Sequence, residues 1–389
     1  MRNELTTLAG GPEAFTFVRH LRLEGTHREI GRALAHAAEI AHGAAAAPRI
    51  VDDLEREAVR RRWFATHYPA HLERSKGVAD HFRRDPDDLG VAFDWVSTYD
   101  IPAGCSVAFY PPAIMKDGAG MLARNFDFPT APFSAFVGLE RLPGERALAA
   151  DPWVIEVHPE RGYASVVIAI MDVMGAMDVI NEAGLAVALL ADNETPDPEP
   201  TRTPRVGLAE QQVVRYLLDT CATVEEAKVA LLMAKHYYAF TPCHFVVADR
   251  SGSSFVWEHS PRRNEEVIVE ADARTDGRLV CTNHLLHRWP DPSQLPVETG
   301  PFGTAALTYR RWESLHAAVE PGAIVDLGDV RDHFAGVRFE APVEGARTFW
   351  QALYDVKQAS VEVSFYVGDV DECSRYSEPI RLSLSTGQH

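Results

Sequence analysis

Residues 104–127 form two apolar runs joined by a polar turn, and this pattern constrains the fold more than any other stretch. The first run begins with Gly104 and Cys105, and the second carries Arg124 and Asp127. An Asp-Gly pair between the runs is a turn signal, so the stretch predicts a β-hairpin. Pairing its two strands would bring the cysteine beside the Arg-Asn-Phe-Asp segment.

The hairpin has the groups that a nucleophilic thiol needs, a proton acceptor and a positive neighbour. Arg124 can supply the charge. If the chain were cut between Gly104 and Cys105, the cysteine's own α-amine could take the proton, since its ordinary pKa is about 7.7 to 8. One alternative is that Cys105 is simply buried and inert. The other is that Arg124 and Asp127 form a surface ion pair, which would contribute under about 1 kcal/mol to stability. Alternation along a strand also places Arg124 and Asp127 on opposite faces unless the strand twists or bulges.

The Gly-Cys-Ser segment, followed from residue 123 by Ala-Arg-Asn-Phe-Asp-Phe, resembles the isopenicillin N acyltransferase family of N-terminal nucleophile (Ntn) hydrolases. More distantly it is similar to choloylglycine hydrolase and penicillin V acylase. The resemblance implies a precursor that cuts itself before Cys105 and uses no cofactor. It also implies a four-layer αββα sandwich of two antiparallel sheets. Residues 1–104 would form a mainly helical α-chain and residues 105–389 the catalytic β-chain of one unit.

The same resemblance implies roles for residues beyond the nucleophile. Arg124 would lie against the thiol and Asp127 would hold the new amine. Asn181, in Asn-Glu-Ala-Gly-Leu, and Asn283, in Thr-Asn-His, would donate to the oxyanion. A late arginine would be Arg311 rather than the adjacent Arg310.

These assignments have local alternatives. Asparagine is common at turns such as the one that starts at Asn181, and an arginine on a helix is often simply solvated. An oxyanion donor can contribute about 2.7 to 4 kcal/mol, so Asn283→Ala is expected to lower turnover about a hundredfold with the fold intact. His284 and His287 form a His-x-x-His pair that could bind metal, but no clear third ligand accompanies them, and loop polarity explains the pair better.

Composition excludes several classes of protein. The chain has 389 residues, 56 acidic against 38 basic, and a net charge of -18, which disfavours nucleic acid as a partner. It has no apolar run long enough for a transmembrane helix and no signal-peptide pattern. The five scattered cysteines lack a Cys-x-x-Cys pair, which favours a reducing, cytoplasmic location over a disulfide framework. Of these, Cys221, Cys243 and Cys373 are expected to be buried and inert.

The order of elements is typical of an α+β fold rather than of alternating βαβ units. Thr26 to Glu29 is a capping box that begins a helix, and residues 50–99 contain further helices. Short strands follow near residues 164–171, 177–180 and 185–190. Later elements are listed in chain order: helices at 207–219 and 223–235, a hairpin at 244–258, a strand at 279–283, helices at 308–319 and 329–334, and strands at 361–367 and 379–384.

The sequence therefore predicts a self-processing cysteine amidohydrolase that acts on a small N-acyl amide through a thioester. One alternative is an acyl-coenzyme A-dependent N-acyltransferase at the same site. The others are an uncut binding protein and a metal hydrolase. The Pro-rich loops 193–204 and 289–301 are candidate pocket walls, with Trp289 as an apolar substrate contact. The sequence does not decide whether the chain forms a homo-oligomer.

Overall fold

The computed structural model describes most of the chain, in segments that are listed here: residues 2–94, 104–136, 140–141, 143–170, 174–194, 204–239, 241–260, 265–271, 276–298, 307–341 and 345–384. The predicted loops 193–204 and 289–301 fall partly outside these segments. None of the helices in these segments has the length and apolar character needed to cross a membrane.

Nine strands form the larger sheet, and their order in the sheet largely follows the chain. They are, in sheet order, β1 (Arg2–Gly10), β2 (Phe17–Gly25), β7 (Trp153–Pro159), β8 (Ser165–Ala169), β9 (Asp178–Asn181), β10 (Ala186–Ala191), β11 (Cys243–Ala248), β12 (Ser254–Ser260) and β13 (Glu265–Glu270). All neighbours are antiparallel except β2 and β7, which run parallel. The expectation of purely antiparallel sheets is therefore wrong at this pair, which is joined by a long connection that contains helices and two strands of the second sheet.

The second sheet carries the predicted hairpin at its centre. Its strands, in sheet order, are β14 (Leu279–Cys281), β5 (Gly104–Tyr110), β6 (Met121–Pro129), β15 (Ala346–Asp355), β16 (Ser360–Val370) and β17 (Cys373–Tyr376), with β18 (Ile380–Ser383) also paired to β16. The two strands that flank the hairpin in this sheet, β14 and β15, thus come from the C-terminal half of the chain. A separate short pair joins β3 (Arg49–Ile50) and β4 (Val91–Ala92).

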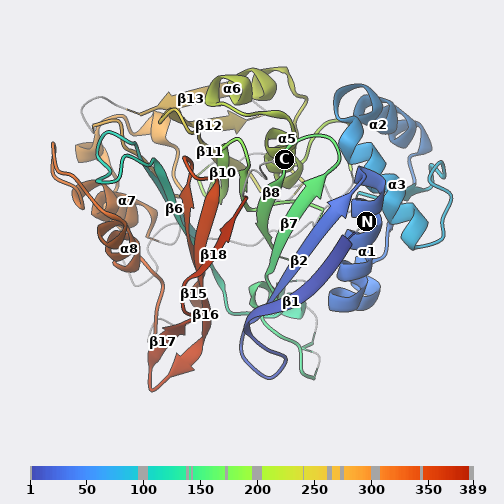
Figure 1. Cartoon of the computed structure of the whole chain (residues 1–389), viewed down its shortest axis with the longest axis horizontal. Coiled ribbons are helices and arrows are strands. Elements are labelled where there is room, and N and C mark those ends of the chain that lie inside the picture. The colour runs from blue at the N-terminus through green and yellow to red at the C-terminus, as the bar shows by residue number, and fades with distance from the viewer. Residues whose placement is uncertain are drawn as a thin grey trace.

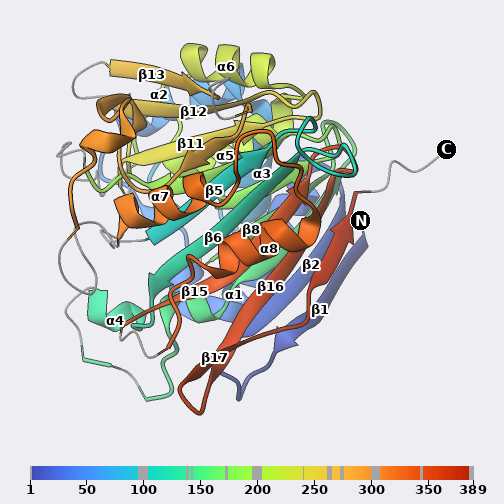
Figure 2. The same ribbon diagram turned by 90° about the vertical axis from the view of Figure 1, so that its left-hand side faces the viewer.

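The two sheets lie face to face, with helices on their outer sides (Figure 1). The helices are α1 (His27–His42), α2 (Leu54–His67), α3 (Pro69–His81), α4 (Phe133–Phe136), α5 (Glu210–Thr220), α6 (Val224–Met233), α7 (Thr308–Ala317) and α8 (Leu327–Ala335). Helices α1 and α5 pack on the nine-stranded sheet, and α7 and α8 contact β5 and β6. Figure 2 shows α7 and α8 lying across the outer face of the hairpin sheet.

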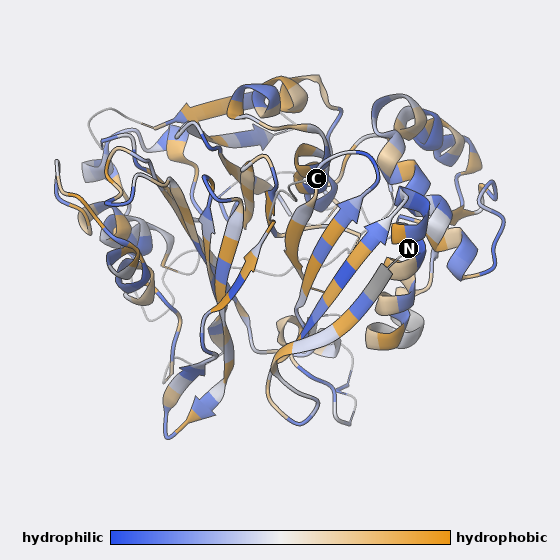
Figure 3. Cartoon of the chain, viewed as in Figure 1, coloured by the Kyte–Doolittle hydropathy of each residue, from blue (hydrophilic) through white to orange (hydrophobic). Residues whose placement is uncertain are grey.

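A large apolar core fills the space between the sheets and beneath α1 and α5, and a second, smaller apolar cluster lies beneath α7 and α8. The central strands β8, β9, β10 and β11 are buried along their whole length because both of their faces are covered, and β10 reads as a continuous apolar run. Strand β2, nearer the sheet edge, alternates between buried and half-exposed residues instead. Figure 3 shows hydrophilic and hydrophobic residues interspersed along β2.

The prediction of a mixed α+β fold with large sheets is confirmed, as is the β-hairpin of residues 104–127. The predicted capping box at Thr26 is also present, with the Thr26 side chain accepting from the Glu29 backbone. Strands β1, β7, β13 and β15 were not predicted. Because β1 and β2 extend the nine-stranded sheet, the segment before Cys105 contributes strands as well as helices.

Candidate active site

Strand register places the hairpin residues on two faces. Cys105 lies opposite Phe126, and Val107 lies opposite Arg124, so these side chains share one face. That face looks toward the other sheet, since the Arg124 guanidinium donates to the Leu189 carbonyl of β10 at 3.0 Å. The alternate residues, which include Asp127, face α7 and α8. No bulge interrupts the β5–β6 register, so Arg124 and Asp127 approach Cys105 from opposite sides.

The Cys105 thiol is buried against a guanidinium. Arg124 Nη2 lies 3.1 Å from Cys105 Sγ, and both side chains are almost completely buried. The other terminal nitrogen of Arg124 forms an ion pair with Asp178 of β9. A second oxygen of Asp178 accepts from the Trp350 indole at 2.6 Å. The sheet facing the hairpin therefore fixes the arginine against the sulfur.

Asp178 is a site residue that the sequence reasoning missed. It occupies the run Met-Asp-Val-Ile and is fully buried. A charged residue inside an apolar strand needs a buried partner, because burying an unpaired carboxylate is very costly. That rule would have flagged Asp178 as the partner of a buried cation.

The backbone nitrogen of Cys105 has its own acceptor. It donates to Asn283 Oδ1 at 2.8 Å, and the same oxygen accepts from Arg311 Nη2 at 2.7 Å. Asn283 Nδ2 donates in turn to the Ala191 carbonyl at 2.7 Å. The hydrogen-bond partners fix which end of the Asn283 amide is oxygen. The nitrogen that cleavage would free is thus already oriented by Asn283.

Arg311 binds the other groups of the same strand start. Its Nη1 donates to the Cys105 carbonyl and, at 2.8 Å, to Ser106 Oγ. It also lies 3.5 Å from a carboxylate oxygen of Asp127, whose other oxygen accepts from Thr348. Burial raises the pKa of Asp127 to about 6, and the nearby Arg311 charge only partly opposes this. Burial likewise lowers the pKa of Arg311.

The structure does not bring Asn181 into this cluster. Its amide nitrogen donates to the Leu218 and Cys221 carbonyls at the end of α5, and its oxygen accepts from the Leu185 backbone. These local bonds use the whole amide to hold the β9–β10 turn against α5. The turn explanation for this asparagine therefore fits the geometry, and its predicted oxyanion role does not.

Arg310 and Trp289 lie outside the direct contacts of Cys105. The Arg310 backbone donates to Glu298, and its side chain helps line a cavity of about 190 Å³ that Arg311 and Arg338 also border. Trp289 is half-buried, and its indole donates to Glu194 at 3.2 Å. The structure thus places Arg311, and not Arg310, in contact with Cys105, while Trp289 as a substrate contact stays a prediction.

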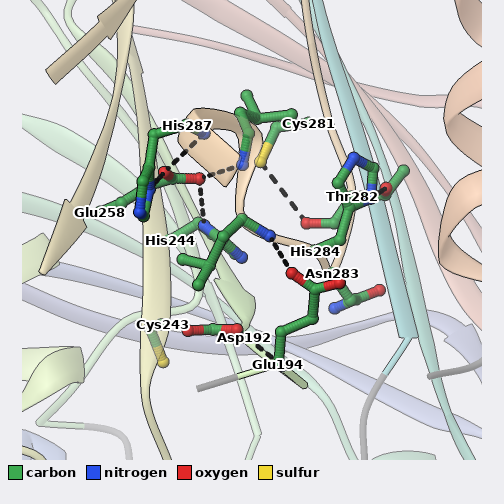
Figure 4. Close-up of polar contacts among 12 residues, drawn as sticks. Asp192, Glu194, Cys243, His244, Glu258, Cys281, Thr282, Asn283, His284 and His287 are labelled. Carbon is green, nitrogen blue, oxygen red and sulfur yellow. Dashed lines mark hydrogen bonds and ion pairs between the residues drawn. The ribbon is translucent and has the colours of Figure 1, made fainter. Parts of the chain in front are cut away.

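A buried charged network supports the loop that carries Asn283 (Figure 4). Glu258 of β12 accepts from the Leu286 backbone at 2.6 Å and pairs with His287. It also lies 3.3 Å from His244 of β11. Burial lowers the pKa of His244, but the hydrogen bond to Glu258 and the charge of Asp192 outweigh it and raise that pKa overall. These bonds join the loop after β14 to the facing sheet.

His284 and His287, the pair considered for metal binding, have different partners. His284 Nδ1 lies 3.0 Å from Thr308 Oγ1, whereas His287 bonds to Glu258. Burial, with the neighbouring His244, lowers the pKa of His284 to about 4. Cys221 and Cys243 are buried as expected, but Cys373 is exposed because it begins the outlying strand β17.

The chain aligns with solved structures of a hydrolase, an acylase and an amidase. A mutant conjugated bile acid hydrolase from Clostridium perfringens aligns with a TM-score of 0.51 and 13% identity, covering 72% of this chain and 92% of that one. Penicillin V acylase from Agrobacterium tumefaciens gives 0.47 at 19% identity, covering 72% and 86%. A Caenorhabditis elegans N-acylethanolamine-hydrolyzing acid amidase gives 0.44 at 15%, covering 65% and 93%. No curated protein sequence matches the chain.

The alignment with the bile acid hydrolase, whose TM-score is above 0.5, shows that the two proteins share a fold. The chain belongs to the acyl-coenzyme A:6-aminopenicillanic acid acyl-transferase family, whose sequence model matches residues 114–365. The predicted family is therefore confirmed. The match includes Arg124, Asp127, Asn283 and Arg311 but begins after Cys105.

Proposed function

We propose that the chain is a self-processing N-terminal cysteine amidohydrolase with Cys105 as its nucleophile, built on the four-layer αββα arrangement of the Ntn hydrolases. The observation that carries the proposal is the surroundings of Cys105. Its sulfur lies 3.1 Å from a buried guanidinium, and its backbone nitrogen lies 2.8 Å from Asn283 Oδ1. A structural cysteine needs neither group, whereas a thiolate with an adjacent amine uses both.

Processing would begin when Cys105 Sγ attacks the Gly104 carbonyl carbon. The carbon–nitrogen bond to Cys105 then breaks, the nitrogen takes the proton, and Gly104 is joined to the sulfur as a thioester. Water hydrolyses this thioester, which leaves a carboxylate on Gly104 and a free thiol and α-amine on Cys105. Arg124 stabilises the thiolate throughout, and Asn283 holds the nitrogen before and after it becomes an amine.

In turnover the α-amine takes the thiol proton and the thiolate attacks the amide carbonyl of an N-acyl substrate. The proton passes to the leaving amine, and the acyl group stays on Cys105 as a thioester. Water as the acceptor gives hydrolysis, which is our proposal. An amine as the acceptor, with acyl-coenzyme A as donor, gives an acyltransferase on the same site.

The substrate test uses the amides that the structural neighbours' names suggest: a conjugated bile acid, penicillin V and an N-acylethanolamine. Released amine is measured with the wild type and with Cys105→Ala. The intact mass of the acid-quenched protein is measured in parallel by mass spectrometry. We expect an acyl adduct on Cys105 that water discharges. Addition of 6-aminopenicillanic acid shows whether an amine competes with water for the acyl group on Cys105. Turnover by Cys105→Ala, or an adduct on another residue, would contradict the proposal.

An uncut binding protein on the same fold is the second candidate, because a site that only binds N-acyl amides could have the same residues around Cys105. It predicts that Cys105 stays inside an intact chain and that N-acyl amides bind without turnover.

A further inference from the structure

Two surface helices of the N-terminal segment bring three metal-binding side chains together, far from the chemistry at Cys105. His36 and Glu39 lie one turn apart on α1, and His81 ends α3. One ligand atom of each lies within 4.8 Å of the others, which makes this the one such cluster among the described residues. We propose that His36, Glu39 and His81 form a binding site for a zinc-class divalent cation that clips α1 to α3.

The helix pair holds these side chains at a fixed spacing. A Cβ atom on Gly31 would come within 2.0 Å of the Arg74 carbonyl, and one on Gly77 within 2.0 Å of the Arg28 carbonyl. Both glycines therefore let the two backbones touch, so α1 and α3 cannot slide apart without losing this contact. Figure 1 shows the two helices side by side on the outer side of the nine-stranded sheet.

The donor atoms already face one another. His81 Nε2 lies 2.9 Å from Glu39 Oε2, and the His36 and His81 rings are 5.5 Å apart between centroids. Zinc holds nitrogen and oxygen ligands at about 2.0 to 2.2 Å, which puts two ligands of one tetrahedral ion about 3.4 Å apart. A shift of about 1 Å in the exposed His36 and Glu39 side chains would close the site. Two imidazoles and a carboxylate suit Zn²⁺, Cu²⁺ or Ni²⁺ better than Ca²⁺ or Mg²⁺.

The chain contains a second His–Glu–His grouping that serves as a comparison. On β2 and β7, Glu156 lies 3.5 Å from His20 and 2.6 Å from His158. There the Arg22 guanidinium also pairs with Glu156. An arginine already pairs with that carboxylate, whereas the ion pair of Glu39 among the described residues is with His81. The difference makes His158→Ala a matched control for the proposed site.

The test measures Zn²⁺ binding to the untagged full-length chain, freed of metal with chelator, by titration calorimetry with ZnCl₂. We expect one ion per chain with a micromolar dissociation constant. His81→Ala, His36→Ala and Glu39→Gln should each weaken it at least tenfold, while His158→Ala leaves it unchanged. Co²⁺ in place of Zn²⁺ should give the visible absorption of a nitrogen and oxygen site, and His81→Ala should remove it.

Zinc should also raise the melting temperature of the wild type but not of His81→Ala, because an ion that binds the folded state stabilises it by mass action. Circular dichroism of His36→Ala, an exposed position, checks that the variants stay folded. The proposal is overturned if the ion binds His81→Ala as tightly as the wild type. It is equally overturned if no binding occurs below about 1 mM Zn²⁺, or if His158→Ala is the variant that loses it.

Discussion

Asn283→Ala removes the side chain that joins three parts of the site. The Cys105 nitrogen and Arg311 Nη2 both lose their shared acceptor, and the Ala191 carbonyl loses its donor. Leaving a buried polar group unpaired costs about 1 to 3 kcal/mol, so the free energy of unfolding should fall by about 3 kcal/mol or more. The expectation from sequence that this variant leaves the fold unaffected is therefore revised.

The same change should slow chemistry at Cys105. A hydrogen bond to a charged group contributes about 1.5 to 3 kcal/mol, which corresponds to a factor of about 10 to 100 in rate. We expect self-cleavage of Asn283→Ala to slow by that factor, measured from intact masses over time and corrected for the folded fraction. Asn283→Asp keeps the oxygen that accepts from Cys105 and should cleave faster than Asn283→Ala.

Asn125→Ala is the matched control. Asn125 is equally buried and donates to the Phe334 carbonyl at 2.7 Å, on the face of β6 that points away from the thiol. It should lose stability but cleave at the wild-type rate per folded molecule. If Asn283→Ala also cleaves at the wild-type rate, Asn283 only supports the structure and our account of the amine is refuted.

Four further substitutions test the charges around the site. Asp127, with its pKa near 6 when folded and an ordinary value near 3.9 when unfolded, is protonated in the folded chain alone between those pH values. The wild type should thus lose up to about 3 kcal/mol relative to Asp127→Asn as the pH rises from 4 to 7, and a constant difference would contradict this. Arg124→Met should cost about 3 to 5 kcal/mol in chemical denaturation because it leaves Asp178 buried and unpaired, and adding Asp178→Asn should recover part of the loss. Glu258→Gln should lower the pKa of His244, followed by NMR, since burial then dominates; an unchanged pKa would show that Glu258 does not hold that proton.

The local parts of the fold could be predicted from sequence because their signals are local. The hairpin followed from two apolar runs and an Asp-Gly turn, and the first helix followed from its capping box. Strand β1 escaped because its pattern is mostly polar and exposed, as befits a sheet edge. The parallel pairing of β2 with β7 depends on a connection of more than a hundred residues, which no local pattern encodes.

The site itself is assembled from distant segments, and periodicity cannot bring these together. Asn283 and Arg311 reach Cys105 across 178 and 206 residues of chain. Only the family resemblance connected them in advance. The resemblance also suggested Asn181, but in the structure the side chain of this residue holds a turn against α5. Asp178 shows the reverse case, since elementary electrostatics could have found it and the motif comparison did not.

The central claim is that the chain cuts itself between Gly104 and Cys105. The most direct measurement is the intact mass of the purified protein under denaturing conditions, with Cys105→Ala prepared in parallel. The account predicts two polypeptides, residues 1–104 and 105–389, from the wild type, and a single uncut chain from the variant. A wild type that stays whole after long incubation, or a Cys105→Ala chain that is cut at the same bond, would contradict it.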